Sequence, residues 1–287
     1  MILLIAAALA FVVVEMSVTY LVARRLRNFG IVDVVWSLGF APIAGLFCFL
    51  APRPGSGAPS LPALVLVVMV AAWSMRLGWH LFVRVKAHHP VEDVRYAQLR
   101  AEWGVHVGPR MYRFFLFQGA IQVLLSLPFA WICLDPIPRG APFHLGVTGI
   151  MGVALWLVGI AGESVADRQL SRFRSMPGNR GKVCQEGLWR WSRHPNYFFE
   201  WIVWVGYAVF ACGSDWGWTG WLSPALMLHF LLNVTGIPMT EALSVKSKGD
   251  AYRLYQQTTS AFFPRPPRKT PVMASPARPA SASVPQS

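Results

Sequence analysis

Long apolar stretches recur along the chain and constrain its fold more than any other feature. A helix that crosses a bilayer needs about 20 mainly apolar residues. Stretches of this kind occupy approximately residues 1–22, 30–51, 61–83, 114–134, 143–165, 197–213 and 218–240. Only 14% of the residues are charged, whereas a soluble globular domain carries about 25%. The sequence therefore predicts an all-α polytopic membrane protein with seven transmembrane helices.

Basic side chains are distributed unevenly between the two sides of this seven-span arrangement. All of the 26 Lys and Arg residues except Arg53, Arg76 and Arg139 fall on one side of the membrane. Cytoplasmic loops of membrane proteins are enriched in Lys and Arg. We therefore expect the N-terminus outside and the C-terminus in the cytoplasm. The same distribution accounts for the net charge of +13, so nucleic acid is not an expected partner.

The spans and their loops are interpreted as one transmembrane domain, residues 1–266. Residues 1–22 lack the basic start and the cleavage site of a secretory signal, and we interpret them as a retained span. Residues 267–287 are rich in Pro, Ala and Ser and have no apolar period, which predicts a disordered tail. The four Cys residues have no metal-ligand spacing, so no metal site is predicted.

Several ionisable residues lie within or at the ends of the apolar stretches. They are Glu15, Asp33, Arg76, His80, Glu163, Asp167, Glu200 and Glu241. A charged group at bilayer depth costs about 2.5–3.5 kcal/mol on insertion scales and marks a functional site by default. A single ion pair between spans, such as Asp33 with Arg76, would serve packing alone. The whole set favours a polar cavity that opens to the cytoplasm.

The richest polar motif is EGLWRWSRHPNYFFEW at residues 186–201. Asn196 and Glu200 are four residues apart, so on a helix they share a face and can hold one ligand group together. The preceding segment is rich in Arg and Lys, which suit phosphate groups. A simpler interpretation of those basic residues is loop charge that contacts anionic lipid.

The run GLWRWSRHPNYFFEWIVWVG, preceded by ESVADRQLSRFRS, closely resembles the C-terminal hallmark of the steroid 5-alpha-reductase-like membrane reductases. Further motifs extend the resemblance, which is to a bacterial branch, over approximately residues 30–266: VDVVWSLGF at 32–40, WSMRLGWHLFVR at 73–84, EDVRY at 92–96 and YRLYQQTTSAFFP at 252–264. The resemblance implies a seven-helix fold in the bacterial cytoplasmic membrane, with NADPH in a cytoplasm-facing cavity. Its cofactor-binding half would span about residues 143–266.

The resemblance also implies a set of cofactor-binding residues. They are Arg76, Arg95, Glu163, Asp167, Arg174, Lys182, Arg193, His194, Asn196, Tyr197, Glu200 and Tyr255. Two of these positions depart from the family's pattern. Lys182 stands where an Arg is usual, and animal members have Asn at the position of Glu163.

The family holds the ketone of its substrate with a Glu on span two and a Tyr on span three. Here the first corresponds approximately to Asp33 and the second to Trp73. Asp33 can donate to a carbonyl oxygen only when it is protonated, and Trp73 can offer only its indole N–H. We therefore name Asp33, Trp73 and Tyr96 as candidate catalytic residues. The proton donor stays open between Tyr96 and His80.

The predicted function is NADPH-dependent reduction of a carbon–carbon double bond conjugated to a ketone in a lipophilic substrate within the membrane. The chain has no GxGxxG, GxSxG or HExxH motif, which argues against a Rossmann domain, a triad hydrolase or a zincin. An S-adenosylmethionine-dependent methyltransferase of the isoprenylcysteine carboxyl type is an alternative, because it has a similar His-Pro-aromatic run. A transporter or lipid-binding scaffold is a second alternative function. Expected partners are a lipophilic small molecule and membrane lipid, with no obligate protein partner.

Overall fold

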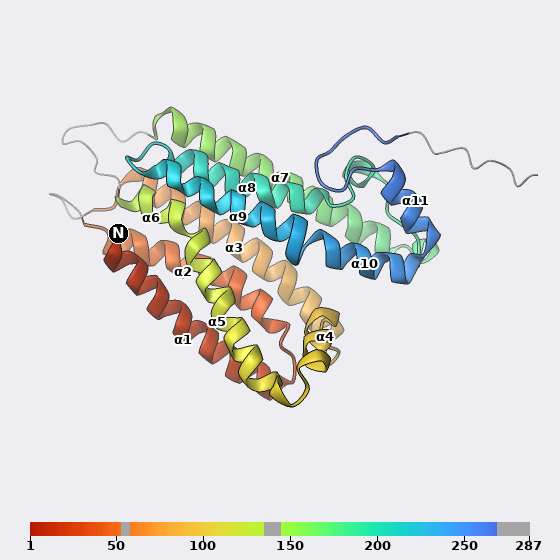
Figure 1. The fold of residues 1–287 in the computed structure, drawn as a ribbon. Helices are drawn as coiled ribbons and strands as arrows, with labels where there is room; N and C mark the ends of the chain where they lie inside the picture. Colours follow the sequence, from red (N-terminus) through yellow and green to blue (C-terminus); the bar gives the residue numbers. More distant parts are fainter. Residues whose placement is uncertain (53–57, 135–144, 269–287) are drawn as a thin grey trace, which may run out of the picture.

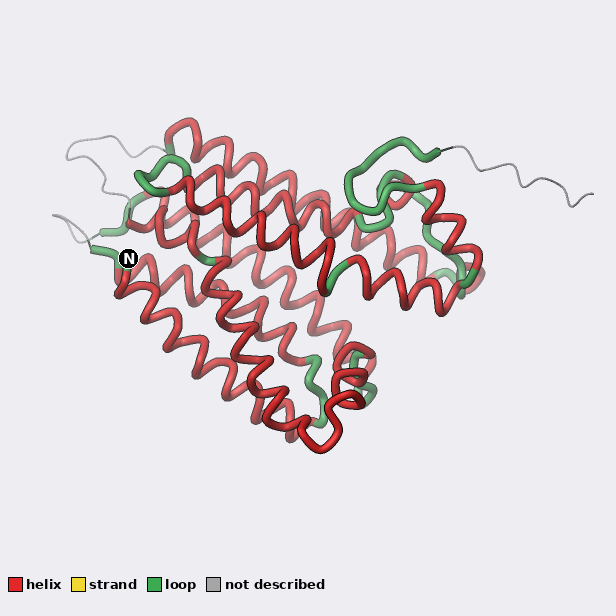
Figure 2. The backbone as a smooth tube through the Cα atoms, viewed as in Figure 1, coloured by secondary structure: helices red, strands yellow, loops and turns green. Residues whose placement is uncertain are grey.

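The computed structural model describes residues 1–52, 58–134 and 145–268, and every regular element within these ranges is a helix (Figures 1 and 2). The long helices run side by side. The N-terminus and α6 lie at one end of the molecule, and α11 lies at the other. The predicted all-helical architecture is confirmed for the described residues.

Three long helices form the N-terminal part: α1 (Ile2–Leu26), α2 (Ile31–Leu50) and α3 (Leu61–His88). Their bounds agree closely with the apolar stretches. The start of α3 is fixed locally, since the Ser60 hydroxyl accepts a hydrogen bond from the Ala63 N–H at 3.1 Å. Such a cap satisfies one of the unpaired donors in the first turn of a helix.

The predicted span at 114–134 is divided in two in the structure. A short helix α4 (Val94–Trp103) and the turn η1 (Gly104–His106) lead into α5 (Val107–Leu125), which is followed by α6 (Leu127–Leu134). The break lies at Ser126, two residues before Pro128. A proline has no N–H and its ring collides with the preceding turn, so it interrupts the regular hydrogen-bond series.

The helices α7 (Gly146–Ser175) and α8 (Pro195–Ala211) pack closely against each other through glycines. A Cβ atom placed on Gly152 would lie 2.7 Å from the Phe210 nitrogen and 2.8 Å from the Gly206 oxygen. A Cβ atom placed on Gly206 would lie 2.8 Å from the Trp156 nitrogen. Backbones this close tolerate no side chain at the crossing, which explains the glycines on both helices.

The C-terminal part is a series of shorter helices joined by distorted turns. In chain order these are η2 (Pro177–Asn179), η3 (Gly187–Arg190), η4 (Gly217–Trp221), α9 (Leu222–His229), the π-turn η5 (Phe230–Val234), α10 (Ile237–Lys248) and α11 (Asp250–Thr258). The predicted span at 218–240 is therefore interrupted by the π-turn. Gly236 and Pro238 follow the turn, and neither favours a continuous helix.

Six segments of the described chain are long and apolar enough to cross a membrane: Ile2–Leu26, Ile31–Leu50, Leu61–His88, Val94–Leu134, Gly146–Ser175 and Gly217–Lys248. The remaining predicted span, 197–213, forms α8. Its 17 residues give a length of about 25 Å, which is shorter than a hydrocarbon core of about 30 Å. The polytopic character is confirmed, whereas the count of seven and the orientation stay predictions. The predicted tail lies, from residue 269 on, outside the described residues.

A buried aromatic core joins the N-terminal and C-terminal parts. The rings of Phe40, Trp73 and Trp204 contact one another in pairs, each with centroids 5.3 Å apart and edge-to-face geometry. Phe129 and Tyr207 extend this core, with a centroid distance of 4.9 Å. Edge-to-face packing of aromatic rings stabilises a core beyond simple burial. The core therefore holds α3 and α8 in fixed register where the first polar cluster begins.

Candidate functional site

The first polar cluster lies where α3, α7 and α8 meet, and Arg76 of α3 is at its centre. The Arg76 guanidinium forms an ion pair with Glu163 and another with Asp167, with 3.2 Å between Nη1 and Oδ2. Asn196 donates from Nδ2 to Asp167 Oδ1 at 3.5 Å. Glu200, one turn further along α8, interacts with Glu163. These five residues, here called the Arg76 cluster, were separate candidates in the sequence and lie together in the structure.

Helical spacing explains how the cluster is assembled. Glu163 and Asp167 are four residues apart on α7, and Asn196 and Glu200 are four apart on α8, so each pair lies on one helix face. Pro195 occupies the first position of α8, where its missing N–H leaves no gap in the hydrogen-bond series. The first turn of α8 therefore presents Asn196 directly to α7.

Glu200 is held by two indole groups. Its Oε2 accepts from Trp73 Nε1 at 2.9 Å, and its Oε1 accepts from Trp204 Nε1 at 2.8 Å. Both Trp side chains are fully buried. The Trp73 N–H, which is predicted from the sequence to bind the substrate, thus already donates a hydrogen bond within the protein. Its observed contact is to Glu200, a candidate cofactor residue.

Some buried polar atoms of the Arg76 cluster have no hydrogen-bond partner. They are Arg76 Nε, Glu163 Oε2 and Asn196 Oδ1. Buried polar groups are nearly always hydrogen-bonded in proteins, so each exception calls for an explanation. A hydrogen-bond donor without a partner lies in the same cluster as acceptors without partners. This arrangement suits a ligand that carries a carboxamide, because a carboxamide both donates and accepts hydrogen bonds.

A second cluster forms around Asp33 near the start of α2. Asp33 Oδ1 accepts from the Tyr96 hydroxyl at 2.6 Å, and Oδ2 accepts from Arg95 Nη2 at 2.5 Å. The ion pair considered in the sequence analysis, Asp33 with Arg76, does not form, because each residue has other partners in the described chain. In the structure both oxygens of Asp33 therefore accept hydrogen bonds from neighbouring side chains. The structure thus brings three predicted residues together: Asp33, Arg95 and Tyr96.

Asp93 anchors Arg95 from the other side. Its Oδ1 accepts from both the backbone N–H and Nε of Arg95, at 3.0 and 2.9 Å. Burial raises the pKa of Asp93, but the hydrogen bonds and charge of Arg95 outweigh burial and hold it below its ordinary value. Arg95 is thereby fixed between two carboxylates, Asp33 and Asp93, at the start of α4.

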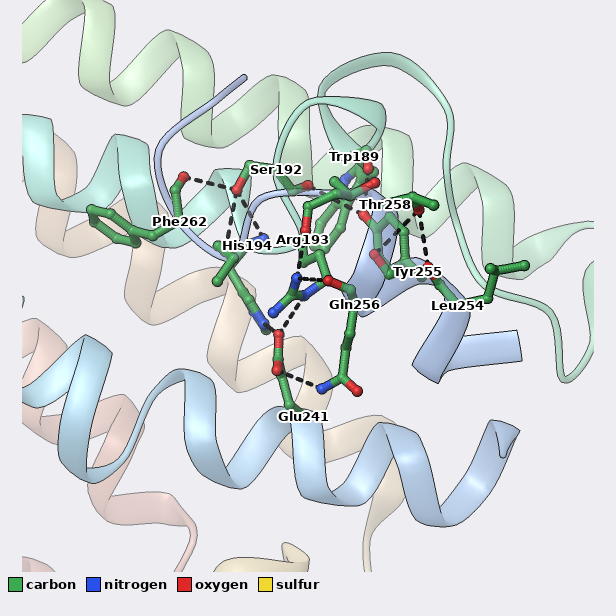
Figure 3. A network of polar contacts seen from close by, with 12 residues as sticks. Trp189, Ser192, Arg193, His194, Glu241, Leu254, Tyr255, Gln256, Thr258 and Phe262 are labelled. Atoms are coloured by element: carbon green, nitrogen blue, oxygen red, sulfur yellow. Dashed lines mark hydrogen bonds and ion pairs between the residues drawn. The ribbon is translucent and has the colours of Figure 1, made fainter. Parts of the chain in front are cut away.

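A third polar network surrounds Arg193, just before α8 (Figure 3). Arg193 Nε donates to Glu241 Oε1 at 2.6 Å, and its Nη1 donates to the carbonyl oxygens of Gln256 and Thr259 at 2.9 and 2.5 Å. His194 Nε2 lies 3.2 Å from the same Glu241 oxygen. Glu241 is absent from the predicted cofactor residues. Its signal in the sequence was its position as an acidic residue at the end of an apolar stretch.

Two predicted tyrosines have partners within the protein. The Tyr255 hydroxyl donates to the Trp189 and Ser192 carbonyl oxygens and is buried, which raises its pKa. The Tyr197 hydroxyl lies 3.3 Å from Thr240 Oγ1. The Tyr197 ring stacks on the His194 ring, with centroids 5.3 Å apart. Tyr255 therefore fastens the loop before α8 to α11, and the structure does not bring it to the Arg76 cluster.

Arg174 and Lys182 stand apart from the three clusters. Arg174 is in the last turn of α7, and neither residue has an ion pair with a carboxylate among the described residues. Lys182 is exposed in the loop that follows. Cationic side chains without acidic partners are suited to phosphate. No group of three or more His, Cys, Asp or Glu residues in the described chain is arranged to hold a metal ion.

The chain is similar to proteins from other organisms. It is 24% identical over 264 residues to an uncharacterized protein of Schizosaccharomyces pombe, and the match covers 83% of this chain and 73% of that protein. It is 36% identical over 73 residues to 3-oxo-5-alpha-steroid 4-dehydrogenase 1 of Bos taurus, a match that covers 25% of this chain and 26% of the bovine enzyme. No solved structure matches. The family described as "Protein of unknown function (DUF1295)" matches residues 19–259, and the chain therefore belongs to this family.

Proposed function

We propose that this protein is a membrane reductase that uses NADPH to reduce a carbon–carbon double bond conjugated to a ketone in a lipophilic molecule. The observation that carries the proposal is the Arg76 cluster, in which three helices direct five polar side chains to one buried place. Support comes from the partial match to the bovine enzyme, which is named as a dehydrogenase of 3-oxo-5-alpha-steroids.

The residues of the Arg76 cluster fit the nicotinamide end of such a cofactor. Its carboxamide needs one acceptor for its NH2 group and one donor for its oxygen. Glu163 Oε2 and Asn196 Oδ1 are unfilled acceptors, and Arg76 Nε is an unfilled donor. Arg174 and Lys182 would hold phosphate groups through charge. When bound, NADPH supplies the hydride that adds to the beta carbon of the enone.

The protein must then supply a proton to the alpha carbon, so that two hydrogens are added in total. We assign this proton to the Tyr96 hydroxyl, because a phenol can release its O–H proton, whereas the indole N–H of Trp73 serves only as a hydrogen-bond donor. In the structure this hydroxyl donates to Asp33 Oδ1 at 2.6 Å, so we infer that it turns from Asp33 to the substrate before the proton is transferred. Tyr96 is buried, which keeps water away from the group that donates.

Cofactor binding by the purified protein in detergent tests the proposal. We expect Asn196→Ala and Glu200→Gln each to weaken NADPH binding, measured by calorimetry, by about tenfold or more, since a buried polar group left without its partner costs about 1–3 kcal/mol. Glu102→Gln makes the same chemical change at an exposed carboxylate of α4 and is the matched control. Wild-type affinity in both cluster variants would show that the cofactor does not bind here. Loss of NADPH absorbance with a panel of lipophilic enones tests turnover.

One contact favours a second candidate, the S-adenosylmethionine-dependent methyltransferase. His194, of the His-Pro-aromatic run, lies 3.2 Å from the Glu241 carboxylate, which is the kind of acidic partner that the methyltransferase motif includes. Only one carboxylate is present at residues 240–241. Calorimetry with S-adenosylmethionine on the same samples separates the two functions, because the reductase binds NADPH and the methyltransferase does not.

A further inference from the structure

A cavity of about 280 Å³ lies between the loop before α8 and the segment that follows α11. Three arginines line it, Arg193, Arg265 and Arg268, and none of the described residues that line it is acidic. Thr258, Thr259 and Ser260 also line it. Arg193 is paired with Glu241, so Arg265 and Arg268 give the wall its net positive charge, which attracts an anion.

Backbone hydrogen bonds fix the shape of this cavity. The Arg193 N–H donates to the Ser260 oxygen at 2.8 Å, the Arg265 N–H donates to the Trp191 oxygen at 2.9 Å, and the Arg268 N–H donates to the Thr258 oxygen at 2.8 Å. The arginines are therefore held by their main chains, so less conformational freedom is lost when a ligand binds.

The guanidinium groups retain binding capacity. Arg193 uses Nε and Nη1 for Glu241 and for two carbonyl oxygens, and none of these hydrogen bonds involves Nη2. Those contacts also cover the carbonyl oxygens at the end of α11, which would otherwise repel an anion. Arg265 and Arg268 are exposed and have no ion pair within the described chain.

We propose that this cavity binds a phosphate monoester, with Arg193, Arg265 and Arg268 as its ligands. Guanidinium groups bind phosphate through paired, nearly parallel hydrogen bonds, and the Ser260 hydroxyl can add another donor. Two sources carry this chemistry. One is the ribose 2′-phosphate that distinguishes NADPH from NADH, and this source rests on the proposed function. The other is the headgroup of an anionic lipid such as phosphatidic acid, which does not.

The test uses the full-length chain in detergent and in nanodiscs, with the double variant Arg265→Ala/Arg268→Ala. Arg253→Ala is the matched control, since Arg253 is an exposed arginine of α11 that pairs with Asp250 and does not line the cavity. Calorimetry compares adenosine bisphosphate carrying the 2′-phosphate with AMP, and vesicle flotation compares phosphatidic acid with phosphatidylcholine. Neither nucleotide contains nicotinamide, so a failure of the Arg76 cluster would not affect this measurement.

We expect the double variant to bind its phosphate ligand about tenfold or more weakly, while the Arg253→Ala protein binds as the wild type does. Preference for the 2′-phosphate over AMP identifies the nucleotide as the source, and preference for phosphatidic acid identifies the lipid. Equal binding of all probes by the wild type and the double variant would overturn the proposal. Wild-type melting temperature in the double variant shows that its fold is intact.

Discussion

Cys184 and Cys212 are two thiols in opposite surroundings, and their chemistry should differ accordingly. Cys184 is buried, and burial raises its pKa, whereas Cys212 is exposed. The thiolate is the reactive form, and its fraction falls about tenfold for each unit by which the pKa rises. We therefore expect iodoacetamide to modify Cys184 about tenfold or more slowly than Cys212 at neutral pH. Its rate should continue to rise with pH far into the alkaline range.

Peptide mass spectrometry of time courses at several pH values measures both rates in one sample. The denatured protein is the control, because there both thiols are equally accessible. Equal rates in the folded protein would mean that the loop containing Cys184 opens readily.

Tyr96 provides a prediction about the reaction. In Tyr96→Phe the ring stays buried and only the hydroxyl that donates to Asp33 is lost. If this hydroxyl supplies the proton, turnover of an enone should fall about a hundredfold, within the usual range for a lost acid catalyst, while NADPH affinity stays unchanged. Tyr112→Phe is the control, since its hydroxyl contacts Ser17 at 3.0 Å. Equal turnover in the two variants would remove Tyr96 from the mechanism.

Local spacing was enough to find some side chains of the site but not their partners. The pair Asn196 and Glu200 follows from a helix spacing of four, and both reach the Arg76 cluster. The contact from Trp73 to Glu200 joins residues 127 positions apart, and only the packing of α3 on α8 creates it. The contact between Arg95 and Asp33 likewise joins residues that are far apart in the sequence, and only the packing of the folded chain creates it. No local sequence pattern predicts which of several buried acidic residues will pair with a given arginine.

Among the elements, α7 and α8 depend most on glycine. Gly152→Ala would place a methyl group 2.7 Å from the Phe210 nitrogen, so α8 would have to move. We expect a loss of about 1–3 kcal/mol in stability, as for other overpacked interiors, seen as a lower melting temperature in detergent. Gly45→Ala is the matched control on α2, because nothing lies within 4 Å of the added atom. A melting temperature of Gly152→Ala equal to that of this control would refute close packing at the crossing.

Apolar length predicted the continuous helices well and the interrupted ones less well. The stretch 30–51 agrees with α2 at Ile31–Leu50, because nothing within it stops the helix. Pro42 lies inside α2 without ending it, whereas the helix does break near Pro128. Both prolines lack the same N–H, so the difference depends on what neighbouring helices offer the freed carbonyl groups. A window of hydropathy contains no information about those neighbours.

At the scale of the whole molecule, α8 decides whether the chain crosses the membrane six or seven times. The turns at its two ends carry the exposed acids Glu186 and Asp215. The uneven distribution of Lys and Arg predicts that α8 crosses, since the residues before it are rich in basic side chains and the turn after it has none. A helix of 17 residues can span if the bilayer thins locally or flanking side chains reach the interface.

We therefore expect Glu186→Cys and Asp215→Cys to lie on opposite sides of the membrane. In a Cys212→Ser background, which removes the exposed native thiol beside Asp215, a membrane-impermeant maleimide applied to sealed vesicles of one orientation should label only one of the two variants. Permeabilised vesicles, in which both should react, are the control, and the unsubstituted chain gives the background from the native thiols. Labelling of both variants from the same side would mean that α8 does not cross, so the basic loops would lie on both sides. The predicted orientation, on which the proposed access of NADPH from the cytoplasm rests, would then be wrong.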